Sequence, residues 1–203
     1  NKDGKKLYSH KYRIEYITGE KGFTSSYLSI GLNSKILELL YFQGIRNENI
    51  RLCYDRLMSD NVVSFSFDSF LDSVCTDVDF KKDVLIQSRE TFSQAIKNLT
   101  EATKPHKQSR KGVNPINKPK NQGIEWTTRK AATSSYCFLK LYNKAVQCAF
   151  DENMHAFYNE YLKDGTEQVE NRIRIEFTIK SRKGFNRMGI ESHRLRDLLN
   201  LSL

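Results

Sequence analysis

Carboxylates occur at alternating positions in two segments of the sequence, which is the spacing that puts side chains on one face of a β-strand. In 74–80, Asp77 and Asp79 share a side, and in 172–180 Glu176 shares its side with arginines and lysines. Side chains change face at every residue of a strand, so adjacent strands would bring these three carboxylates together. Hard divalent cations prefer oxygen ligands. The pattern therefore predicts a site for Mg²⁺ or Mn²⁺.

A third alternating segment, 136–142, carries Tyr136, Lys140 and Tyr142 on one side. A tyrosine hydroxyl is an oxygen nucleophile that can form a covalent intermediate, and a metal ion stabilises charge on phosphoryl oxygens. Together these groups suit attack on a phosphodiester. The cations expected to hold the nucleic-acid backbone around them are Lys140, Arg172, Arg174, Lys180 and Arg182. Taken singly, an Asp-x-Asp pair is also typical of a solvated strand edge, and a strand tyrosine of packing.

Residues 104–122 form a basic segment with six lysines or arginines, no acidic residue and all three prolines of the chain. Proline removes a backbone donor and restricts the chain, so we predict an extended arm without regular structure. Lys107, Arg110 and Lys111 of this arm are expected to neutralise DNA phosphates and release their counterions. A solvated linker is the alternative interpretation.

The composition is typical of an ordinary globular chain, and its positive net charge favours a polyanionic partner. The 203 residues are 38% hydrophobic and 28% charged, with a net charge of +9, which points to nucleic acid. We expect one domain spanning 1–203, located in the cytoplasm with reduced cysteines and no membrane association, because no apolar run approaches the length of a membrane span. The four histidines are scattered without a His-x-His pair, which gives no support to a histidine-bound metal.

The elements that must position these residues alternate between strands and helices. Strands are predicted at 7–18, 23–32, 69–84, 124–128, 135–142 and 171–183, the first two forming a hairpin. Helices are predicted at 35–43, near 47–59, at 88–103, from the end of 135–142 to about 162, and near 191–200. This order favours an α+β fold with a central, mainly antiparallel sheet and helices packed on one face.

Two segments in a fixed order carry a family resemblance. "KLYNKAVQ" (140–147), followed some thirty residues later by "RIRIEFTIKSRK" (172–183), resembles the replication initiators of filamentous phages. These are rolling-circle nickases related to plasmid initiators that lack a His-hydrophobic-His pair. Upstream, "SVCTDVDF" (73–80) is similar to the family's Asp-bearing strand, and "YLSIGLNSKILE" (27–38) to its strand that enters a helix.

The resemblance implies specific roles for residues of this chain. Tyr142 would be the nucleophile that forms a 5′-phosphotyrosyl link and frees a 3′-hydroxyl, with Lys144 steadying the scissile phosphate. Asp77 and Glu176 would bind the metal; Asp79 joins them only through its position on the strand. Relatives often carry Glu five residues after the tyrosine, where this chain has Gln147, which puts a base or metal role there in doubt.

The function expected from the resemblance is metal-dependent nicking and joining of DNA that starts rolling-circle replication of a phage or plasmid in the bacterial cytoplasm. Its partners would be single- and double-stranded origin DNA, with host helicase and polymerase. Two alternatives are a non-catalytic nucleic-acid-binding module and a metal-dependent nuclease that uses water as nucleophile. Spacing alone also leaves Tyr136 as a second candidate nucleophile.

Overall fold

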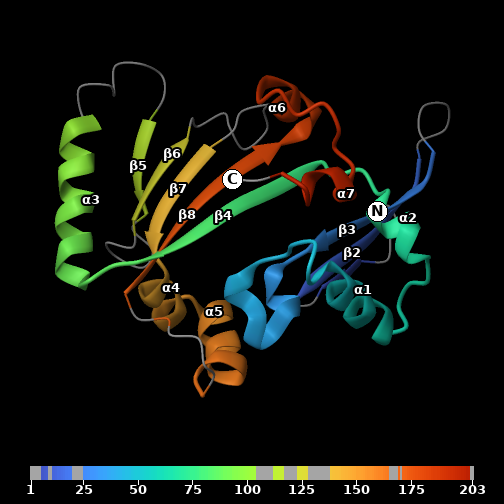
Figure 1. Ribbon diagram of the computed structural model, residues 1–203, viewed down its shortest axis with the longest axis horizontal. Helices are drawn as coiled ribbons and strands as arrows, with labels where there is room; N and C mark the ends of the chain where they lie inside the picture. Colours follow the sequence, from blue (N-terminus) through green and yellow to red (C-terminus); the bar gives the residue numbers. More distant parts are fainter. Residues whose placement is uncertain are drawn as a thin grey trace. The chain divides into compact units, whose positions relative to one another are not determined.

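The computed structural model describes residues 6–8, 11–19, 25–103, 112–116, 123–127, 138–164, 169 and 171–201. It combines helices with antiparallel sheets, which confirms the predicted α+β class (Figure 1). The sequence was interpreted as one domain, 1–203, whereas the chain divides into two compact units, Asn1–Phe67 and Asp68–Leu203. Each unit has its own sheet and is described by itself.

The first unit is built on a three-stranded antiparallel sheet, β1 (Lys6–Tyr8), β2 (Tyr12–Ile17) and β3 (Tyr27–Leu32), in that order. The predicted hairpin is present, but its first strand is divided into β1 and β2. The 3₁₀ helix η1 (Ser34–Gln43) follows, with the Asn33 side chain accepting a hydrogen bond from the Lys35 amide. Helix α1 (Ile50–Ser59) comes next, and α2 (Phe67–Leu71) begins at the unit boundary. Leu37, Cys53 and Leu57 form part of the buried interior.

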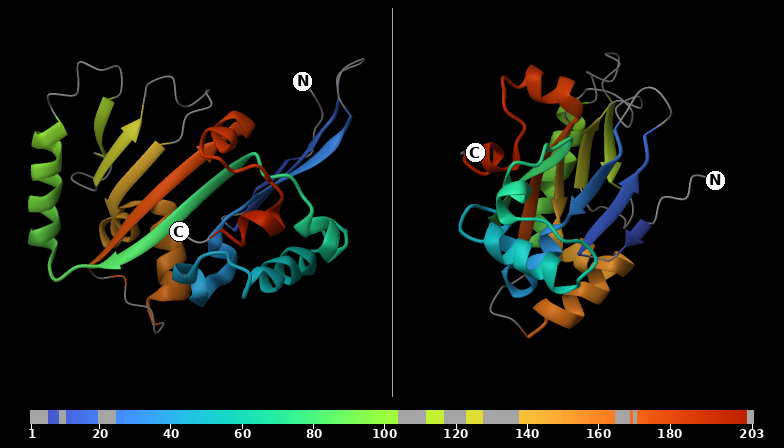
Figure 2. Two further views of the ribbon diagram at one scale, coloured as in Figure 1. Left: turned by 45° about the horizontal axis from the view of Figure 1, so that its top comes forward. Right: turned by 90° about the vertical axis from the view of Figure 1, so that its right-hand side faces the viewer.

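The second unit is organised by a five-stranded antiparallel sheet. Its strands lie in the order β4 (Asp77–Leu85), β8 (Arg172–Lys180), β7 (Phe138–Asn143), β6 (Gly123–Thr127), β5 (Gly112–Ile116) (Figures 1 and 2). β6 approaches β7 closely because Gly123 faces Tyr142. A Cβ at position 123 would lie 2.0 Å from the Leu141 carbonyl oxygen.

Two predictions of secondary structure are corrected by this sheet. The segment 69–84 was predicted to be strand throughout, but its first residues belong to α2, whose Phe70 is buried, and β4 begins only at Asp77. The basic arm was predicted to lack regular structure, yet 112–116 of it is strand β5. Pro115 is compatible with β5 because this strand is at the sheet edge, where a missing amide donor costs least.

The helices of the second unit are α3 (Arg89–Thr103), α4 (Lys144–Phe150), α5 (Glu152–Phe157), the π-helix η3 (Tyr158–Leu162), α6 (Ser181–Arg187) and α7 (Leu195–Leu198). The predicted helix up to about 162 is therefore interrupted at Asp151, whose side chain caps α5 by accepting from the Met154 amide at 2.9 Å. The predicted strand 171–183 is too long, since the chain enters α6 at Ser181 with φ of 67°.

The sheet of the second unit has one apolar and one polar face. Ile179 of β8 is fully buried and packs with Phe185 of α6 and Leu198 of α7, beside Val78 and Phe177. Side chains at even positions of β8 and odd positions of β4 emerge on the other face, because strand residues alternate. That second face carries the charged residues.

Candidate active site

Cross-strand pairing arranges charges of opposite sign beside one another on the polar face. Glu176 of β8 lies between Lys81 of β4 and Lys140 of β7. One pair further along, Arg174 lies between Asp83 and Tyr142. Opposite charges directly across strands attract, so this register is favoured electrostatically. It places the tyrosine next to an arginine and diagonal to a carboxylate.

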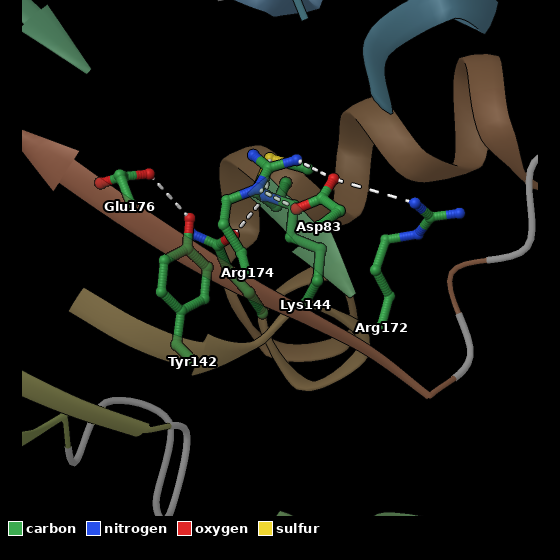
Figure 3. A network of polar contacts seen from close by, with 8 residues as sticks. Asp83, Tyr142, Lys144, Arg172, Arg174 and Glu176 are labelled. Atoms are coloured by element: carbon green, nitrogen blue, oxygen red, sulfur yellow. Dashed lines mark hydrogen bonds and ion pairs between the residues drawn. The ribbon is translucent and has the colours of Figure 1, made fainter. Parts of the chain in front are cut away.

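Tyr142 and Glu176 are joined by a hydrogen bond. The Tyr142 hydroxyl donates to Glu176 Oε2 at 3.0 Å (Figure 3). Lys140 Nζ donates to the other carboxylate oxygen at 3.1 Å. A carboxylate within hydrogen-bond reach of a hydroxyl, and itself held by a third group, is the arrangement of an activated nucleophile. The Tyr142 side chain is nevertheless largely covered, because the residue is only 6% exposed.

Arg174 and Asp83 form a bidentate ion pair beside the tyrosine. Arg174 Nε and Nη2 donate to the two Asp83 oxygens at 2.7 and 2.8 Å, and Arg172 Nη1 lies 3.9 Å from the same carboxylate. Burial acts to raise the pKa of Asp83, but the hydrogen bonds and charge of Arg174, together with the charges of Lys81 and Arg172, leave that pKa below its ordinary value. With Arg174 3% exposed, this pair belongs to the interior.

Lys144 lies at the start of α4, where the Asn143 side chain caps the helix through the Val146 amide at 3.1 Å. Its ammonium donates to the Gln147 side-chain oxygen, lies 3.8 Å from the Met154 sulfur, and is 5.8 Å from the centre of the Tyr142 ring. Lys144 is 1% exposed. Burial, followed by the charge of Arg174, lowers the pKa of Lys144 to about 7.

The burial of Lys144 bears on the role expected for it. The resemblance placed this lysine on the scissile phosphate, but the structure directs its ammonium into the interior, toward α4 and α5. Gln147, which stands where relatives often have Glu, is the partner of this ammonium.

The three carboxylates expected to bind a metal do not converge. Asp79 is the cross-strand neighbour of Thr178 and accepts a hydrogen bond from the Thr178 hydroxyl. Glu176 is the cross-strand neighbour of Lys81, two residues further along each strand. Asp77 pairs with Lys180, four residues along β4 from the partner of Glu176, which is roughly 13 Å of strand. In the described ranges, no group of three or more His, Cys, Asp or Glu could hold a metal ion. These residues therefore do not fit a three-carboxylate metal centre.

The other residues predicted to bind DNA or to react are not all at the site. Lys140 is at the site, and Arg172 beside Asp83. Lys180 is at the far end of β8, and Arg182 lies beyond it in α6, on the helix that covers the apolar face. Lys107, Arg110, Lys111 and Tyr136 lie outside the described residues.

Sequence reasoning missed two residues of the polar network. Asp83 lies within the predicted strand 69–84 and shares the alternation of Asp77 and Asp79, so following that alternation beyond residue 80 would have included it. Lys81 has the same parity and directly faces Glu176. Burial and the charge of Arg174 hold the pKa of Lys81 well below its ordinary value.

Comparison with known proteins gives no match of the chain to a family model, a curated protein or a solved structure. Among the helices that the structure describes, none combines the length and the apolar character needed to cross a membrane. The function is therefore inferred from the residues of the site.

Proposed function

We propose that this chain is a DNA nicking and joining enzyme of the rolling-circle initiator type, in which Tyr142 is the nucleophile. The observation that carries the proposal is the Tyr142–Glu176 hydrogen bond of 3.0 Å, with Lys140 on the second carboxylate oxygen. It unites on one sheet face the tyrosine and the glutamate of the two segments that carry the family resemblance.

The reaction uses the side chains of this network. The Tyr142 oxygen attacks a backbone phosphorus while Glu176 accepts the hydroxyl proton. The bond from phosphorus to the 3′-oxygen breaks, and the leaving oxygen takes a proton from solvent to become a 3′-hydroxyl, while Glu176 releases to solvent the proton that it accepted. The 5′-phosphate stays on the tyrosine, and attack by a 3′-hydroxyl reverses the step and rejoins the strand. Lys140 holds Glu176 in place, and the Arg174–Asp83 ion pair is on the strands beside the tyrosine.

A non-catalytic nucleic-acid-binding module is the second candidate, and the low exposure of Tyr142 and Arg174 favours it. In that case the hydrogen bonds and ion pairs hold strands β4, β8 and β7 together, and a phosphate never reaches the tyrosine hydroxyl. A nuclease that activates water would also cut DNA but would leave no covalent link.

Supercoiled DNA carrying the candidate origin distinguishes the three functions. The protein is incubated with this DNA, denatured, and analysed for nicked circles and for protein that remains attached to a 5′ end. The proposal expects both products, and expects both to vanish with Tyr142→Phe while DNA binding persists. Tyr16→Phe is the matched control, because Tyr16 is an exposed tyrosine of the first unit, and it should nick normally. Nicks without an adduct, or binding without nicks, would refute the proposal.

A further inference from the structure

The segment 61–66, which connects α1 to α2 (Figure 1), borders a pocket that the proposed reaction does not use. The pocket has a volume of about 410 Å³, which is within the range of binding sites in proteins. It is lined by Tyr54 and Met58 of α1 and by the five residues from Asn61 to Phe65, none of which is charged. All of them belong to the first unit.

The backbone of this segment is held at both ends. At its start, the Asn61 amide donates to the Met58 carbonyl at 3.0 Å. At its end, the Tyr54 hydroxyl donates to the Phe65 carbonyl at 2.5 Å, and the Tyr54 ring meets the rings of Phe65 and Phe67 edge-on. A segment that is ordered before it binds a partner loses less conformational entropy on binding.

The middle of the segment has no backbone partner. Val62, Val63 and Ser64 form no hydrogen bond with any residue that the structure describes. Exposure alternates along 63–66 as in a β-strand, because Val63 and Phe65 are half-buried whereas both serines are exposed. The segment thus resembles an edge strand without a neighbour, which offers its N–H and C=O groups to another chain.

The chemistry of the pocket favours a peptide over nucleic acid. Phosphates are held by cations, and the lining contains none. Arg51 of α1 lies over the rings of Tyr54 and Phe67, but it pairs with Asp55 at 2.9 Å, so its charge is already compensated. An extended peptide uses both features of the site, since its backbone can pair with the segment while an apolar side chain fills the pocket.

We propose that the segment 61–66 binds an extended peptide of a partner protein. The peptide pairs with the backbone of Val62–Ser64 and places one apolar side chain in the pocket beside Tyr54 and Met58. Main-chain hydrogen bonds supply affinity, and the pocket supplies the preference for an apolar, uncharged side chain. The inference does not depend on the proposed nicking, because the pocket shares no residue with the Tyr142 site.

The test uses the whole isotope-labelled chain and synthetic peptides of the form acetyl-Thr-Thr-X-Thr-Thr-amide, in which X is Leu, Ala or Glu. Threonine favours an extended backbone. NMR shifts of the protein amides locate the site and give the affinity. The Leu peptide should shift the amides of Val62, Val63 and Ser64. The other two peptides should bind at least about tenfold more weakly, because alanine buries less apolar surface and glutamate brings a charge into an uncharged pocket.

Two N-methylated forms of the Leu peptide test the backbone pairing. One carries the methyl group on the Leu amide and the other on the amide of the next threonine. Successive amides of a strand point to opposite edges, and only one edge pairs with the segment. One form should therefore lose binding and the other should keep it. Equal affinities of the two methylated peptides would overturn the inference.

A pair of protein variants tests the location of the site. Val62→Lys introduces a charge at a residue that is 47% exposed, so the fold should be kept, and the Leu peptide should bind at least about tenfold more weakly. Val74→Lys is the matched control, because Val74 is an exposed valine of the second unit, and it should leave the affinity unchanged.

Three results would overturn the inference: no saturable shift at Val62–Ser64, equal binding of the Leu peptide by the two variants, or shifts at these amides caused by an oligonucleotide or a second copy of the chain in place of the peptide. Adduct formation at Tyr142 should be the same in both variants. Absence of the adduct in the unsubstituted protein would overturn the proposed function and leave the peptide site intact.

Discussion

Replacing Glu176 by glutamine tests whether this carboxylate accepts the proton of Tyr142. Glutamine has nearly the same shape and keeps an oxygen that can accept a hydrogen bond, but it cannot take up the proton. General-base catalysis contributes about 10²–10⁴ in rate, or about 3–5 kcal/mol of activation free energy. We therefore expect Glu176→Gln to slow adduct formation by about 100- to 10,000-fold.

The fold should tolerate this change. The Lys140–Glu176 ion pair is partly exposed, with side-chain exposures of 28% and 14%, and a screened pair of this kind contributes at most about 1 kcal/mol. Loss of one negative charge should also leave DNA binding equal or slightly tighter. The rate loss can then be separated from any loss of folded protein.

The assay is single-turnover formation of the protein–DNA adduct on a labelled origin oligonucleotide, with binding and urea unfolding measured on the same samples. Glu125→Gln is the matched control. Glu125 is on strand β6, where it is the cross-strand neighbour of Lys140 and lies on the same face of the sheet, so this variant should form the adduct at the normal rate. If Glu176→Gln forms the adduct within threefold of the unsubstituted protein, the assignment of Glu176 as the base is wrong.

Three further predictions address the surrounding network. Asp83→Ala leaves the buried Arg174 unpaired and should lower the free energy of unfolding in urea by about 3–5 kcal/mol, while Asp83→Leu with Arg174→Met should recover much of it. The folded-state pKa of Asp83 lies below its unfolded value, so the contribution of Asp83 to the free energy of unfolding should be present above about pH 4 and be lost as the pH falls below that value. A difference in free energy of unfolding between Asp83→Asn and the unsubstituted protein that does not change with pH would contradict this. The pKa of Lys144, about 7 when folded and 10.5 when unfolded, should make stability rise between pH 7 and 10, and Lys144→Met should flatten that rise in thermal unfolding. Excess chelator tests the divalent ion implied by the family resemblance: because Asp77, Asp79 and Glu176 do not converge, adduct formation by the proposed step should persist, and loss of the adduct that Mg²⁺ or Mn²⁺ restores would show that a divalent ion is required.

Alternation along the chain was enough to predict which residues of each strand share a face. The period of two in 172–180 placed Arg174 and Glu176 together, and the same period placed Lys140 with Tyr142. These assignments depend on the backbone geometry of a single strand, so they need no knowledge of the partners. The α+β class followed in the same way from the order of local patterns.

The tertiary structure decided which of these residues meet, because strand register and helix packing arise from contacts between segments far apart in the sequence. Register separates Asp77 from Glu176 and instead gives Arg174 the partner Asp83, 91 residues away. Packing of α4 and α5 buries Lys144, although the resemblance implied that this lysine would contact the scissile phosphate. The turn at Ser181 likewise carries Arg182 to the other side of the sheet. A local pattern specifies the direction of a side chain, but its neighbour is set by the free energy of the whole packed unit.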